Sequence, residues 1–144
     1  MKKILVLFSN IRDKREAIEY AINKAKEEDA HITFLYILDE SIPREFSIWL
    51  MYMGFLGEKP IREIRNIILD EVKKNAKELI EEVKERLEKE RIPHSVVFLE
   101  GDFSKVLKDF FKKEKFDLII MPKEKEIISG KVERFKFEVE VEEI

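Results

Sequence analysis

The sequence predicts one α/β domain with an open, mostly parallel β-sheet that helices cover on both faces. Short, near-continuous apolar runs are typical of strands that are buried on both faces. Amphipathic helical segments separate these runs, and alternating strands and helices favour a parallel sheet with right-handed crossovers. A chain of 144 residues is long enough to bury a core as a single domain, 1–144, without disulfides.

Five segments are predicted as strands. Four are near-continuous apolar runs, namely Lys3–Phe8, Ile32–Leu38, Ser95–Leu99 and Leu118–Met121. The fifth, Phe135–Val141, alternates instead, with Phe135, Phe137, Val139 and Val141 on one side and charged residues between them. We therefore expect the fifth strand to be an edge strand or a dimer strand.

Helical patterns fill the gaps between the strands at Asp13–Glu28, Ile61–Arg91 and Phe103–Lys113. The second has an apolar stripe at steps of three and four along its whole length, which predicts one very long amphipathic helix. Pro60 precedes this helix and Pro93 follows it, as suits a helix start and a helix stop. Asp102 is the expected N-cap of the third helix.

Two segments fit this scheme less plainly. Ser41–Lys59 is a loop by position, yet it is rich in large apolar residues around Trp49, Met51 and Tyr52. These side chains either pack under the long helix or form a surface for a partner, and we weigh the two equally. Pro122–Arg134 joins the fourth and fifth strands, either through a short crossover helix or through a hairpin-like return.

Composition narrows the classes of function. Charged residues make up 41% of the chain, but 28 basic and 31 acidic residues nearly balance, so the basic surface that nucleic acids require is missing. This abundance of Lys and Glu is typical of hyperthermophilic proteins. The absence of cysteine fits a reducing compartment. With no apolar run near the roughly 20 residues of a membrane span, we expect a cytoplasmic protein without membrane contact.

At the level of the whole chain, the sequence resembles the universal stress protein family. The resemblance rests on KILVLF followed by AIEYAINKAK, on ITFLYILDE, on the very long second helix, on EGD after VVFL, and on FDLIIMP. It implies a three-layer, Rossmann-like fold with strand order 3-2-1-4-5. It also implies a crevice for ATP between the first and fourth strands, and homodimers built through the fifth strand.

The chain departs from the motif of the family's ATP-binding members, which is Gly-x2-Gly-x9-Gly-Ser/Thr after the fourth strand. Pro122 and Lys125 stand at the first two glycine positions, and Phe135 and Lys136 replace the last pair. The Asp that ends the family's first strand falls on Ser9. Pro has a fixed φ and no N–H to donate to a phosphate, so the chain resembles the branch without the nucleotide motif. We expect no cofactor. The residues that would line the crevice if a nucleotide bound are Ser9, Asn10, Leu38, Pro122, Lys123, Lys125 and Gly130.

The polar residues near the ends of the predicted strands are expected to have structural roles. His31 and His94 begin strands, so we expect surface histidines at the amino end of the sheet, away from the crevice. At the carboxyl end, Asp39, Glu40 and Glu100 are expected to be solvated or ion-paired. Asn10 is expected to cap the first helix together with Asp13, although basic residues nearby keep an anion site open. No catalytic residue or metal ligand is predicted, and Ser9 has no histidine that could activate it.

Two functions follow. The first is a non-enzymatic stress-response or regulatory module that acts as a homodimer and contacts an unknown protein partner. The second is a nucleotide-binding protein with a divergent phosphate loop. Membrane association through the region around Trp49 is weaker because the polar residues there are not strongly basic. The expected interface residues are Trp49, Met51, Tyr52, Phe135, Phe137, Val139 and Val141.

Overall fold

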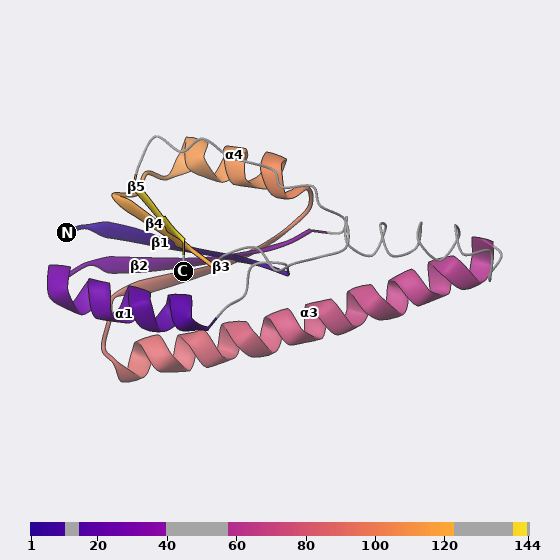
Figure 1. Cartoon of the computed structure of the whole chain (residues 1–144), viewed down its shortest axis with the longest axis horizontal. Helices are drawn as coiled ribbons and strands as arrows, with labels where there is room; N and C mark the ends of the chain where they lie inside the picture. The colour runs from indigo at the N-terminus through magenta and orange to yellow at the C-terminus, as the bar shows by residue number, and fades with distance from the viewer. Residues whose placement is uncertain (11–14, 40–57, 123–139, 144) are drawn as a thin grey trace.

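A computed structural model of the chain describes residues 1–10, 15–39, 58–122 and 140–143 (Figure 1). Its sheet is parallel throughout and has the order β3-β2-β1-β4-β5. This order confirms the predicted fold class and places β1 in the middle. The strands are β1 (Lys3–Ser9), β2 (His31–Leu38), β3 (His94–Glu100), β4 (Leu118–Met121) and β5 (Glu140–Glu143).

Helices cover both faces of the sheet, which gives the three predicted layers. α1 (Glu16–Glu28) and α3 (Glu58–Lys89) lie together on one face, and α4 (Phe103–Lys113) lies on the other (Figure 1). Each face has its own core, because side chains alternate between the faces along each strand. Val6 and Phe34 pack toward α1 and α3, whereas Leu7 and Leu35 pack toward Leu107 of α4.

The boundaries of the buried elements agree closely with the sequence. α4 and β4 have the predicted limits. β1 and β2 are each one residue longer than the predicted apolar run, and β3 is one residue longer at both ends. Every residue from Ile32 to Leu38 is buried, as continuous apolar strands require. Among the described helices, none is long and apolar enough to cross a membrane.

Two helix starts were predicted wrongly. α1 begins at Glu16 instead of Asp13, and its N-cap position is Arg15, which makes no side-chain capping bond. Asn10 therefore does not cap α1. α3 begins at Glu58, so Pro60 lies inside the helix instead of before it. Proline is tolerated there because the first N–H groups of a helix have no partner within the helix.

The prediction for β5 is corrected at its end, because the described strand runs from Glu140 to Glu143 and so extends beyond Val141. The predicted start at Phe135 lies outside the described residues. β5 pairs in parallel with β4, and Glu140 lies opposite Leu118, the first residue of that strand. Parallel pairing excludes the hairpin-like return between these two strands. The predicted face of Phe135, Phe137 and Val139 lies outside the described residues.

Candidate functional site

The carboxyl end of the central strands is the place where open α/β sheets bind ligands, because the strand order reverses there. β1 ends at Ser9, which is fully buried. β4 lies beside β1 with Val6 opposite Ile120, so Pro122, which is buried, follows at the level of Phe8. The predicted residues Ser9, Leu38 and Pro122 are thus gathered at this end.

Asn10 joins the ends of β1 and β2. Its side-chain Nδ2 donates to the carbonyl oxygen of Asp39 at 2.9 Å, and the N–H of Asp39 donates to its Oδ1 at 3.1 Å. The amide thus takes the place of one more step of the β1–β2 ladder, in which Ser9 lies opposite Ile37. Both amide groups of Asn10 are engaged by protein, which explains why this side chain is not the predicted helix cap.

Carboxylates occupy the start of α4 at the same end. Asp39 Oδ2 accepts from the N–H of Phe103 at 3.3 Å, and Asp102 Oδ2 accepts from the N–H of Lys105 at 3.1 Å. The N-cap predicted for Asp102 is therefore confirmed. Asp39 was expected to be solvated or ion-paired, but it bonds to the helix because the N–H groups of a first helical turn need acceptors.

The turn between β3 and α4 is held closely against β2. The N–H of Gly101 donates to the carbonyl oxygen of Leu38 at 3.0 Å. Gly101 has a φ of 142°, which side chains rarely tolerate, and a Cβ there would lie 3.0 Å from Val106 Cγ2. Next to it, Glu100 forms the expected ion pair, with Lys73 Nζ at 3.6 Å. In the described part of the carboxyl end of the sheet, polar groups thus bond to one another.

The two histidines lie at the opposite, amino end of the sheet, as predicted. Both are half-buried instead of fully exposed. His94 Nδ1 lies 2.7 Å from the carbonyl oxygen of Ile92, and His31 Nε2 lies 3.3 Å from Ser95 Oγ. His31 Nδ1 is buried and finds no hydrogen-bond partner among the residues that the structure describes. Burial lowers the pKa of His31, and the positive charge of Lys3 and the ring of His94 lower it further, against a smaller opposing effect of Glu114.

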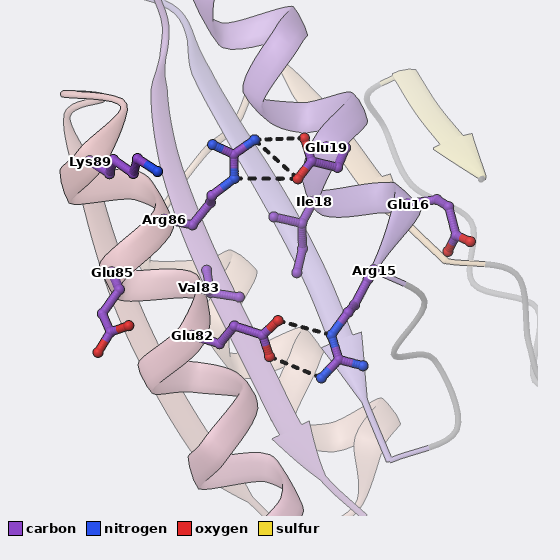
Figure 2. A pocket seen from close by; sticks show the side chains of 9 residues that line it. All are labelled: Arg15, Glu16, Ile18, Glu19, Glu82, Val83, Glu85, Arg86 and Lys89. Atoms are coloured by element: carbon purple, nitrogen blue, oxygen red, sulfur yellow. Dashed lines mark hydrogen bonds and ion pairs between the residues drawn. The ribbon is translucent and has the colours of Figure 1, made fainter.

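An open groove lined mainly by charged side chains lies between α1 and α3 (Figure 2). The guanidinium of Arg15 contacts Glu82 at 3.1 and 2.9 Å, and Arg86 contacts Glu19 at 2.9 Å and also pairs with Glu90. The hydrogen bonds from Arg15 lower the pKa of Glu82. Two ion pairs, Arg15–Glu82 and Arg86–Glu19, thus join α1 to α3 across the groove.

The chemistry available at these sites is limited. In the ranges that the structure describes, no three histidine or carboxylate side chains are arranged to hold a metal ion. Ser9 is separated from both histidines by the length of the sheet. Sequence reasoning missed the bonds from Asn10 to Asp39 and from Asp39 to Phe103, because both join residues far apart in the chain. Lys123, Lys125, Gly130, Trp49, Met51 and Tyr52 lie outside the described residues.

Comparison with known proteins relates this architecture to one family. A model of the universal stress protein family matches residues 1–135. Among curated proteins, no sequence matches the chain at a significant level. Three solved structures share its fold at low sequence identity, and they support the fold alone.

The first of these is the universal stress protein UspA from Lactobacillus plantarum, with 17% identity and a TM-score of 0.65 over 99% of this chain and 97% of that one. The second is a hypothetical protein whose biochemical function was assigned from its structure, with 18% identity and a TM-score of 0.60 over 86% and 76% of the two chains. The third is a universal stress family protein from Burkholderia pseudomallei, with 13% identity and a TM-score of 0.55 over 81% and 78%. The family model and the strand order agree, and the chain belongs to the universal stress protein family.

Proposed function

We propose that this chain is a non-enzymatic stress-response or regulatory module that works in the cytoplasm as a homodimer through protein contacts. In this proposal it does not bind ATP by the family's usual motif and has no cofactor. Two observations support the proposal: the match to the family model, and the contacts made by the residues at the carboxyl end of the sheet.

The observation that carries the proposal is the end of β1. The position that ATP-binding members fill with Asp is Ser9 here, and Ser9 is fully buried. The amide of the next residue, Asn10, is engaged on both sides by the backbone of Asp39. Both side chains that would meet a nucleotide at this strand are thus used within the protein.

Charge and backbone chemistry support the same reading. The carboxylates of Asp39 and Asp102 take up N–H groups at the start of α4, and their negative charge opposes a bound polyphosphate. Pro122 follows β4 without an N–H to offer a phosphate oxygen. The absence of catalysis is proposed because Ser9 and the two histidines lie at opposite ends of the sheet, so neither histidine can serve as its general base.

The test for ATP is a calorimetric titration with ATP and magnesium, accompanied by thermal shift with AMP, GTP and NAD. We expect no binding of low-micromolar strength. Replacing Pro122 and Lys125 with glycine should raise affinity only partly, because the later Gly-Ser/Thr pair is also absent. Low-micromolar binding by the unaltered chain would contradict the proposal and favour the alternative of a nucleotide-binding protein with a divergent phosphate loop.

The homodimer is tested by sedimentation equilibrium. Val139→Pro should weaken a contact through the β5 region, and Trp49→Ala should lower self-association or partner binding more than stability. If Trp49→Ala instead keeps the native mass and loses about 3–5 kcal/mol of unfolding free energy, the region around Trp49 is core.

A further inference from the structure

β3 forms one edge of the sheet, and its outer backbone is open in the described part of the chain. Among residues 1–10, 15–39, 58–122 and 140–143, β2 is its only neighbouring strand, and His94–Glu100 make no backbone hydrogen bond beyond that ladder. Val96, Val97, Phe98 and Leu99 are half-buried, while the apolar residues of β1 and β2 are fully buried. The strand has no lysine, proline or bulge to block pairing, and such edges readily accept another strand.

The ladder with β2 fixes which backbone groups point outward. The carbonyl oxygen of Pro93 accepts from Ile32, and the N–H of Gly101 donates to Leu38, both at 3.0 Å. In a parallel pair, alternate residues of a strand bond to the same neighbour. The odd-numbered residues from 93 to 101 therefore face β2. The residues whose N–H and C=O groups point to the open edge are His94, Val96, Phe98 and Glu100.

We propose that the β3 edge pairs, antiparallel, with the β3 edge of a second copy of this chain about a two-fold axis at Val97. Directly opposed, hydrogen-bonded residues in an antiparallel pair must both direct their backbone groups toward the partner. An axis at Val97 satisfies this rule over the full strand. It sets Val96 opposite Phe98 and His94 opposite Glu100, each twice, as a self-complementary interface requires.

Side-chain chemistry favours a second copy of this chain as the partner of the β3 edge. Val96 against Phe98 is a pair of a β-branched and an aromatic residue, which is among the favourable cross-strand pairs. His94 meets a carboxylate at both ends. Its Nδ1 donates to the carbonyl oxygen of Ile92, so Nε2 donates to the Glu100 carboxylate of the partner only when the ring is protonated. One oxygen of Glu100 contacts Lys73. The contact is therefore apolar in the middle and sets a basic side chain opposite an acidic one at its ends.

The opposite edge of the sheet lacks this complementarity in its described part. β5 has the sequence Glu140, Val141, Glu142 and Glu143. Every two-fold antiparallel pairing confined to these residues sets at least one glutamate opposite another, and like charges directly opposite are destabilising. The β3 contact is thus separate from the contact proposed for the β5 region. If both form, assemblies larger than a dimer result.

The chain has no cysteine, so a single introduced thiol reports the register cleanly. At Val97 the two copies would form a non-hydrogen-bonded pair with Cα atoms about 4.5 Å apart, within the range of a disulfide. Ser95→Cys is the matched control. Ser95 is more exposed than Val97, but the proposed register separates the two copies of residue 95 by about 13 Å.

Under mild oxidation, Val97→Cys should form a cross-linked dimer roughly tenfold faster than Ser95→Cys, because the held pair has a high effective concentration. Equal or faster cross-linking of Ser95→Cys would indicate random collision and overturn the proposal. Absence of cross-linking in both variants, with a monomeric native mass at micromolar concentration, would also overturn it. In that case an extended peptide of another protein is the better occupant.

A charge exchange tests the same contact without oxidation, in the Val139→Pro background so that the β5 region does not contribute. His94→Glu sets two glutamates opposite each other, and Glu100→Lys sets lysine opposite histidine, so each should weaken self-association in sedimentation. The double variant pairs glutamate with lysine and should restore it, while circular dichroism checks the fold of each. Weakening without restoration in the double variant would contradict the register.

Discussion

The two ends of the sheet satisfy their polar groups in different ways. At the carboxyl end, Asn10 bonds to the backbone of Asp39, and aspartates take up the first N–H groups of α4. At the amino end, the N–H of Lys3 donates to Asp117 at 2.8 Å, but His31 keeps a buried ring nitrogen without a partner. In its described part, the end where such folds bind ligands therefore has polar groups that bond to one another. The opposite end holds His31, whose protonation the fold opposes.

Removing the amide of Asn10 should break the carboxyl end most strongly. Asn10→Ala removes the amide that bonds to both the N–H and the C=O of Asp39 at a part-buried site, so we expect a loss of about 2–3 kcal/mol in unfolding free energy. Urea denaturation measures it. Asn10→Asp is the control, since it keeps an acceptor for the N–H and should lose less. Equal losses in the two variants would show that the paired bonds do not hold this end.

A smaller loss is expected from Gly101→Ala, at about 1–2 kcal/mol. The φ of 142° disfavours any side chain, and the added Cβ would meet Val106 at 3.0 Å. Gly101→Ala combined with Val106→Ala separates the two causes. If the double variant is no less stable than Val106→Ala alone, then contact, and not backbone strain, is responsible.

The cap of α4 should contribute less again. Asp102→Ala removes the acceptor for the N–H of Lys105 and should cost about 1 kcal/mol. Asp102→Asn keeps an acceptor oxygen and should lose only a few tenths of that. Equal denaturation midpoints for Asp102→Ala and the unaltered chain would mean that Asp39 alone sustains the start of the helix.

The sequence could predict the strands and the helix cap that depend on residues close to one another in the chain. The apolar runs of β1, β2 and β4, and the cap at Asp102, depend on residues within one element, and the structure has them as expected. The register of β5 could not be predicted in the same way, because it depends on pairing with β4, where Leu118 lies opposite Glu140. The alternation of Phe135–Val141 is a local signal and carries no information on that register.

The candidate site was harder to predict for the same reason. A helix cap and a cross-strand amide use the same chemistry of Asn10, and only the position of Asp39, 29 residues away, decides between them. The environment of His31 likewise depends on distant residues, because its Nε2 contacts Ser95 of β3 and the charge of Lys3 in β1 helps to lower its pKa. For polar residues near strand ends, the sequence thus shows which chemical groups are present, but only the fold shows which partners they contact.

The smallest predicted effect belongs to the amino end, and it depends on pH. The pKa of His31 is lowered in the folded chain, chiefly by burial and then by Lys3 and His94, while Glu114 opposes the shift. The neutral ring can donate from Nε2 to Ser95, whereas protonation would give the buried Nδ1 a hydrogen without an acceptor. Because the unfolded chain takes up the proton first, stability should fall as pH drops below the ordinary value near 6.5, and level off once the folded ring is also protonated.

The measurement is the free energy of unfolding at steps from pH 7.5 down to about 5, before most carboxylates titrate. His31→Gln removes the titrating ring and should give a shallower dependence below the ordinary histidine pKa, with little change above it. His94→Gln is the matched control, because it removes only one of the lesser contributors to the shift and should leave most of the dependence in place. The opposite result would be a flatter curve for His94→Gln and an unchanged curve for His31→Gln. It would mean that His31 does not cause the pH dependence, and the contrast between the two ends of the sheet would then fail.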